Sequence, residues 1–147
     1  MEWLNQLQGQ VVGLDSAPLI YFIEENPGYL EITEAFFAAM INREFRVVTS
    51  VVTLAEVLVY PLRQRNAALA QQYRDILFNQ RSLNTIRITS DIAEIAAQIR
   101  ADYNLRIPDA IQMATAVNRG AAFFLTNDAR LPSLPELTVL VLDQLRG

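Results

Sequence analysis

Short apolar runs recur along the chain and predict buried strands. The clearest cover residues 11–14, 121–125 and 138–142, and each is apolar at consecutive positions instead of every second one. Two weaker candidates, residues 46–49 and 85–88, carry β-branched side chains beside turn-like polar residues. Because strands that are apolar on both faces need cover on both faces, these runs predict a parallel sheet of about four to five strands between helices.

Between these runs the apolar positions recur every three or four residues, which is the spacing of an amphipathic helix. Such stripes cover residues 32–40, 69–77, 92–99 and 111–117. Pro108 and Gly120 mark the start and the end of the last of these helices. The alternation of strands and helices predicts the α/β class, a three-layer sandwich with right-handed crossovers. A chain of 147 residues fits one domain, which we expect to cover residues 1–147.

Composition removes whole classes of chemistry. The chain has no Cys and no His, and all 12 basic residues are Arg. It therefore lacks an imidazole base, a thiol nucleophile, a lysine that could form a Schiff base, and the usual ligands of a zinc site. An enzyme built from these residues must rely on carboxylates, hydroxyls, Tyr and Arg. Carboxylate and hydroxyl oxygens are ligands that suit Mg²⁺, Mn²⁺ and Ca²⁺.

The charge of the chain limits how it could meet nucleic acid. Its net charge of −4 argues against binding by bulk electrostatics, because that mode needs a basic face. The stretch from Arg63 to Arg81 is expected to form a polar helix, whose ordinary interpretation is a solvated face. The sequence shows neither a signal peptide nor an apolar run long enough to span a membrane, so we expect a cytoplasmic protein.

Four acidic residues stand at the expected element boundaries. Asp15 and Asp128 follow strands, Asp109 lies in the first turn of a helix, and Glu56 stands three residues after Thr53, as in a capping box. Each one alone is explained as a helix cap or a turn residue. Together they indicate a metal site, because functional groups collect beyond the carboxyl ends of parallel strands and a divalent cation needs two or more carboxylates.

The segments around these acids resemble the four motifs of the PIN-domain nucleases, and most of all those of the VapC-type toxin ribonucleases. The matching segments, in the family's order and spacing, are residues 13–20, 49–58, 107–116 and 124–128. The resemblance implies a parallel sheet between helices and metal-dependent cleavage of RNA. It also implies that the catalytic residues, which hold Mg²⁺ or Mn²⁺, are Asp15, Glu56, Asp109 and Asp128, with Ser16 and Thr126 as supporting hydroxyls. One departure follows the last acid, where Ala129-Arg130-Leu131 replaces the further acid or aromatic residue that the family often has.

The expected reaction is hydrolysis of a phosphodiester by a metal-activated water, leaving a 5′-phosphate and a 3′-hydroxyl. The resemblance further implies a homodimer and often a small antitoxin partner. The apolar stripes of residues 19–23 and 32–40 are candidates for the surface of association, although such a stripe is more often core. RNA phosphates would be met by local arginines, for which the candidates are Arg63, Arg65, Arg74, Arg81, Arg106 and Arg130.

Two other functions stay open at this point. A PIN-like module whose acids no longer hold metal would bind RNA or a protein partner without cutting it. A carboxylate-metal phosphatase would typically carry an Asp-x-Asp pair after its first strand. Position 17 is Ala, which counts against the phosphatase.

Overall fold

The expected parallel sheet is present in a computed structural model of the protein, which describes residues 1–146. Its strands are β1 (Val11–Leu14), β2 (Arg46–Ser50), β3 (Leu83–Ile86), β4 (Phe123–Thr126) and β5 (Thr138–Val141). The order across the five-stranded sheet is β3-β2-β1-β4-β5, and every neighbouring pair is parallel. The predicted fold class is confirmed. Residue 147, the last of the expected domain, lies outside the described residues.

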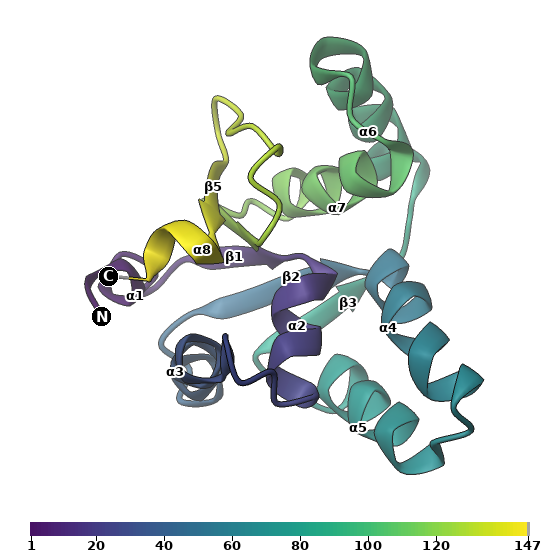
Figure 1. Cartoon of the computed structure of the whole chain (residues 1–147). Helices are drawn as coiled ribbons and strands as arrows, with labels where there is room; N and C mark the ends of the chain where they lie inside the picture. The colour runs from purple at the N-terminus through teal and green to yellow at the C-terminus, as the bar shows by residue number, and fades with distance from the viewer. Residues whose placement is uncertain (147) are drawn as a thin grey trace.

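Helices cover both faces of the sheet (Figure 1). One face carries α2 (Ser16–Ile23), α3 (Leu30–Ile41) and α5 (Ala67–Phe78), and the other carries α6 (Ser90–Tyr103) and α7 (Ile107–Asn118). Helix α4 (Val51–Arg63) follows β2 directly and contacts α2, α5 and α7. The single turns α1 (Glu2–Asn5) and α8 (Leu142–Leu145) lie beside each other near the two ends of the chain. No helix within residues 1–146 is long and apolar enough to cross a lipid bilayer.

The strands divide their side chains between two cores, which explains their uninterrupted apolar sequence. Val47 packs with the core formed by α2, α3 and α5, whereas its neighbour Val48 packs with the core formed by α6 and α7. Leu125 and Phe124 of β4 divide in the same way. Since successive side chains of a strand point to opposite faces, a strand covered on both sides must be apolar throughout.

The two apolar stripes suggested as a surface of association belong to the core. Leu19 of α2 and Phe36 and Met40 of α3 are fully buried, and Ile32 is 5% exposed. Their apolar character is therefore explained by packing within the chain, and the expectation that these stripes form an interface is wrong. The large apolar side chains that do reach solvent lie elsewhere and include Ile41, Val59, Tyr60, Leu62 and Phe78.

The stretch from Arg63 to Arg81 is not the single polar helix that its composition predicts. Helix α4 ends at Arg63, and the backbone reverses at Arg65, where φ is 53°. Asn66 then starts α5 as its N-cap, with its side chain accepting a hydrogen bond from a backbone N–H. Only Arg74 lies on α5, and Arg81 follows it in the connection to β3. The arginines are therefore spread over separate segments and do not share one face.

Candidate active site at the carboxyl ends of the strands

The site begins where two adjacent strands end. β1 and β4 run side by side and in the same direction, so that Asp15, directly after β1, lies beside Thr126, the last residue of β4. The Thr126 hydroxyl donates a hydrogen bond of 2.8 Å to Asp15 Oδ2. The other oxygen, Asp15 Oδ1, accepts the backbone N–H of Ser16 at 2.8 Å and caps the start of α2. These two bonds fix the orientation of the Asp15 carboxylate.

Asp15 lies among like charges. Burial raises the pKa of its carboxyl above the usual range, and the negative charges of Asp109 and Glu56 raise it further, against the opposing effect of its two hydrogen bonds. The structure thus brings Glu56 of α4 and Asp109 of α7 within electrostatic reach of Asp15. A cation placed among these groups would relieve their mutual repulsion.

Glu56 reaches the site through Ser16. The Ser16 hydroxyl donates a hydrogen bond of 2.6 Å to Glu56 Oε1, across the gap between α2 and α4. The capping box expected for Glu56 is wrong, because α4 begins earlier, with Ser50 as its N-cap. Thr53 is therefore a residue of the helix, fully buried, and Glu56 is left to point toward the site.

A chain of buried hydrogen bonds lies beneath the acids and joins four elements, α7, α4, β2 and β1. Gln112 Nε2 of α7 donates to Thr53 Oγ1 at 2.6 Å, the Thr53 and Thr49 hydroxyls are 2.7 Å apart, and Thr49 Oγ1 donates to the Leu14 carbonyl at 2.8 Å. Since a hydroxyl has one proton and that of Thr49 is used on Leu14, Thr53 is the donor to Thr49. Sequence reasoning missed these residues. The one available signal was a glutamine inside the apolar stripe of α7, one turn after Asp109.

The remaining two acids are held by arginines of the same chain. Arg106 Nε donates to Asp109 Oδ2 at 3.2 Å. The Arg130 side chain donates two hydrogen bonds to Asp128, from Nε to Oδ1 at 3.0 Å and from Nη2 to Oδ2 at 2.8 Å. The Arg130 backbone N–H also donates to Asp128 Oδ1. The hydrogen bonds from Arg130 hold the pKa of the Asp128 carboxyl below its usual range, although partial burial acts in the opposite direction.

The donor set fits a hard divalent cation in chemistry, because every acidic side chain offers oxygen ligands and Asp15 is surrounded by negative charge. The side-chain positions are less favourable. Within residues 1–146, no group of three acidic side chains is close enough to hold a metal ion. Asp109 and Asp128 are turned toward arginines, and Glu56 is turned toward Ser16.

Two of the six arginines that the sequence suggested for RNA contact reach the acids, Arg106 and Arg130. The others have no described hydrogen bond to them. Arg65 and Arg74 line a separate cavity of about 370 Å³ between the end of α4 and α5. Arg81 lies near Arg46, at the amino end of β2 and so at the opposite edge of the sheet.

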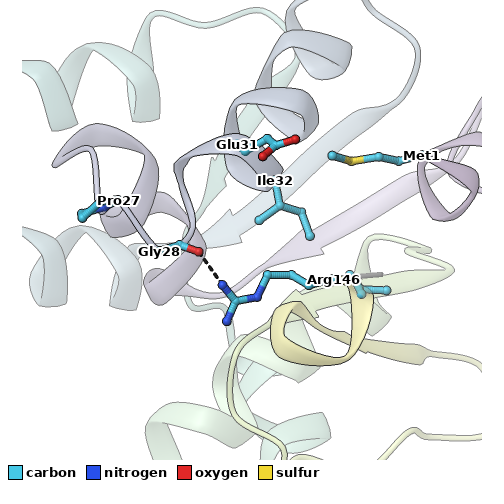
Figure 2. A pocket seen from close by; sticks show the side chains of 7 residues that line it. Met1, Pro27, Gly28, Glu31, Ile32 and Arg146 are labelled. Atoms are coloured by element: carbon cyan, nitrogen blue, oxygen red, sulfur yellow. Dashed lines mark hydrogen bonds between the residues drawn. The ribbon is translucent and has the colours of Figure 1, made fainter.

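The C-terminal segment lies away from the acids, but one of its hydrogen bonds holds the loop that carries Asp128. Arg146 donates to the Gly28 carbonyl and lines a cavity of about 410 Å³ between α3 and α8 (Figure 2). One turn earlier, the backbone N–H of Asp143 donates to Asn127 Oδ1 at 3.0 Å. Asn127 stands between Thr126 and Asp128, so the end of the chain holds the loop that carries the last acid. Glu31 is the one acidic side chain among the described residues that line this cavity.

Several solved structures share this fold. A toxin–antitoxin complex from Klebsiella pneumoniae is 24% identical to this chain, with a TM-score of 0.65, and covers 87% of this chain and 95% of its own. VapBC2 from Rickettsia felis, solved with a DNA fragment from its promoter, is 15% identical, with a TM-score of 0.69 and coverages of 89% and 98%. VapC20 from Mycobacterium tuberculosis, described as a toxin that cleaves the sarcin-ricin loop, is 15% identical, with a TM-score of 0.63 and coverages of 78% and 86%.

Family membership comes from a second comparison. Curated protein sequences give no match to the chain. A model of the PIN domain family, in contrast, matches residues 12–137, which is most of the chain and includes all four acids. The resemblance to VapC-type PIN nucleases is confirmed by this match together with the shared fold, and the chain belongs to the PIN domain family.

Proposed function

We propose that this protein is a metal-dependent endoribonuclease and the toxin of a toxin–antitoxin pair, acting on RNA in the cytoplasm. The observation that carries the proposal is the convergence of acids from separate elements at one edge of the sheet, where Asp109 and Glu56 act on the pKa of Asp15. Similar folds described as toxins, one of them cleaving the sarcin-ricin loop, support the choice of RNA.

The catalytic roles follow from how each side chain is held. Asp15, fixed by two hydrogen bonds, would hold Mg²⁺ or Mn²⁺ together with Glu56, Asp109 and Asp128. When bound, the cation lowers the pKa of water and neutralises charge that develops on the phosphate. Ser16 and Thr126 orient the carboxylates that they contact. Because the chain has no histidine, a carboxylate oxygen is the side-chain group that can accept the proton of the attacking water.

Two protein partners belong to the proposal, a second copy of the chain and a small antitoxin. The similar structures from Klebsiella pneumoniae and Rickettsia felis are described as complexes with antitoxins. The second half of α4 offers an apolar surface for association, since Val59, Tyr60 and Leu62 are 43%, 55% and 59% exposed. Light scattering over a range of concentrations tests the homodimer, and a protein that stays monomeric throughout would contradict it.

One observation favours a non-catalytic alternative. Asp109 and Asp128 are each paired with an arginine, and such a neutralised site would suit a module that only binds RNA or a protein. Thermal stability with and without Mn²⁺ separates the two functions, because a ligand present at 100 times its dissociation constant adds about 2.7 kcal/mol to the free energy of unfolding. The binding module predicts no such gain.

The deciding experiment uses labelled structured RNA, purified protein, and Mg²⁺ or Mn²⁺ with and without chelator. The variant Asp109→Asn should lower the cleavage rate by about 10²-fold or more, since metal catalysis contributes several kcal/mol to the barrier. Asp91→Asn is the matched control, because Asp91 occupies the first turn of α6 as Asp109 does that of α7, without contact to the site. Equal loss in both variants, or cleavage that continues in chelator, would contradict the proposal. The products should carry a 5′-phosphate and a 3′-hydroxyl.

A further inference from the structure

Two carboxylates of the candidate site already have cationic partners within the chain. The Arg106 and Arg130 side chains are 71% and 80% exposed, whereas those of Asp109 and Asp128 are 16% and 25% exposed. In each pair, therefore, the acid is largely embedded in the protein while the guanidinium stands in solvent. Because the guanidiniums are in solvent, the arginines can leave once a cation takes their place on the carboxylates.

We propose that Arg106 and Arg130 exchange partners: they hold Asp109 and Asp128 in the metal-free protein and move to phosphates of the RNA when a divalent cation takes these carboxylates. This inference rests on the proposed function. It adds a defined role for two residues that lie outside the four acids.

The charges of this cluster support the exchange. The two pairs form one electrostatic unit, because Arg130 also acts on Asp109, and Arg106 also acts on Asp128. Without a cation the arginines and carboxylates balance. A divalent cation on the carboxylates leaves the two guanidiniums unbalanced, and phosphodiester groups supply the matching negative charge. With Asp15 and Glu56 included, the four carboxylates and two arginines carry a net charge of −2, and one divalent cation neutralises it, so that RNA can approach the freed guanidiniums even in a chain with a net charge of −4.

The surroundings offer room for this movement. A cavity of about 220 Å³ lies between the pairs, which form part of its wall together with Tyr103, Asn104, Leu105 and Leu131. It is smaller than an ordinary ligand pocket, which measures about 300 Å³ or more, but it can admit a phosphodiester group. Tyr103 is 38% exposed at this cavity and offers a ring on which a neighbouring base can stack.

The first test measures the affinity of Mn²⁺ alone by isothermal titration calorimetry. Arg106→Gln and Arg130→Gln should each tighten Mn²⁺ binding by up to about fivefold, the equivalent of one exposed ion pair. Arg119→Gln is the control, because Arg119 caps the far end of α7 and its removal changes the net charge equally. Arg130→Lys keeps the charge but loses the pair of guanidinium hydrogen bonds to Asp128, and should also tighten Mn²⁺ binding. A wild-type affinity in Arg130→Lys would show a general charge effect and overturn the exchange.

The second test measures RNA binding with and without Ca²⁺, which takes the same oxygen ligands, on a single-stranded RNA confirmed intact after each measurement. With Ca²⁺, the double variant R106Q/R130Q should bind more weakly than wild type, and its slope of log affinity against log salt should be shallower by about 1.4, or 0.7 for each lost phosphate contact. Without Ca²⁺, variant and wild type should agree, because the arginines are then held by the acids.

The outcomes separate this inference from the proposed function. A variant that weakens RNA binding equally with and without Ca²⁺ would show that the arginines contact RNA from the outset, and the exchange would be wrong. If wild type binds Mn²⁺ and the variants Arg106→Gln and Arg130→Gln bind it with the same affinity, the exchange is wrong and the metal site stands. Wild-type protein that binds no Mn²⁺ would overturn the metal site and the exchange together.

Discussion

Asp15 shows how one residue can serve the local fold and oppose it at the same time. It caps α2 and accepts a hydrogen bond from the Thr126 hydroxyl, yet its burial and its acidic neighbours raise its pKa from the usual 3.8. A carboxyl whose pKa is higher in the folded than in the unfolded protein stabilises the fold at low pH. That stability is lost as the pH rises through the folded pKa, so above this pKa the ionised Asp15 carboxylate lowers the free energy of unfolding.

Asp15→Asn should therefore raise the free energy of unfolding of the metal-free protein at pH 7, since the amide oxygen still accepts the Ser16 N–H and no charge is buried. The fall in stability from about pH 4 upward should also become smaller in the variant. Urea denaturation in chelator, followed across this pH range, measures both effects. A variant that is about 1 kcal/mol less stable than wild type would show that Asp15 acts as an ordinary helix cap.

At the scale of elements, α4 and α7 are tied together beneath the site by the buried chain from Gln112 through Thr53 to Thr49. The sequence could not reveal this chain, because its partners stand 59 residues apart along the sequence and become neighbours only in the folded sheet. The capping box predicted for Thr53 and Glu56 is wrong because the sequence alone did not place the start of α4. Ser50 ends β2 and caps α4 directly, so the helix begins at Val51, two residues before Thr53.

Thr53→Val should lower the free energy of unfolding by about 1–3 kcal/mol, because it leaves the buried Gln112 amide without an acceptor. Thr115→Val is the matched control: Thr115 is equally buried, but its hydroxyl donates to a carbonyl of its own helix. That change should be close to neutral. Chemical denaturation of the two variants measures the difference, and equal losses would mean that the hydroxyl of Thr53 does not link the elements.

Contact between α7 and the central strand requires the absence of a side chain at position 13. A Cβ there would lie 2.6 Å from Ala116 Cβ and 2.8 Å from Phe124 Cδ1. Gly13→Ala should therefore destabilise the protein by about 1–3 kcal/mol through overpacking. Gly9→Ala does not test packing, since its strain comes from a φ of 73° in open space. The double variant G13A/A116G, measured by denaturation, should lose less stability than the sum of the losses in its two single variants, because it removes the closer of the two contacts. Additive losses would contradict this cause.

At the scale of the whole molecule, the sequence could predict the sheet and the edge at which the acids collect, because both follow from apolar runs and from what stands after them. It could not predict which of the arginines lie near the acids. Arg106 with Asp109 and Arg130 with Asp128 are local pairs, two or three residues apart, and spacing alone could have suggested them. The separation of Arg63 and Arg81 depends instead on the turn at Arg65, which divides one expected helix into two.

This distribution leads to a prediction about RNA binding. Arg63 stands seven residues beyond Glu56 on α4, which is about 10 Å along a helix, and Arg81 lies near the amino ends of the strands. At 0.15 M salt, charges are screened over about 8 Å. The quadruple variant that replaces Arg63, Arg65, Arg74 and Arg81 with Gln should thus bind RNA as wild type does at this salt concentration, and more weakly only at about 0.01 M, where screening extends over about 30 Å.

Fluorescence anisotropy with one labelled RNA, recorded at both salt concentrations, decides the matter, and R106Q/R130Q in the presence of Ca²⁺ serves as the positive control. The quadruple variant loses twice as much positive charge as this control. If total charge governs binding, it must show the larger defect at every salt concentration. If the position of charge governs binding, the order reverses at 0.15 M salt, because among the described arginines Arg106 and Arg130 contact acids that we propose to hold the cation. A larger defect in the quadruple variant at 0.15 M would contradict the prediction that the position of charge governs binding.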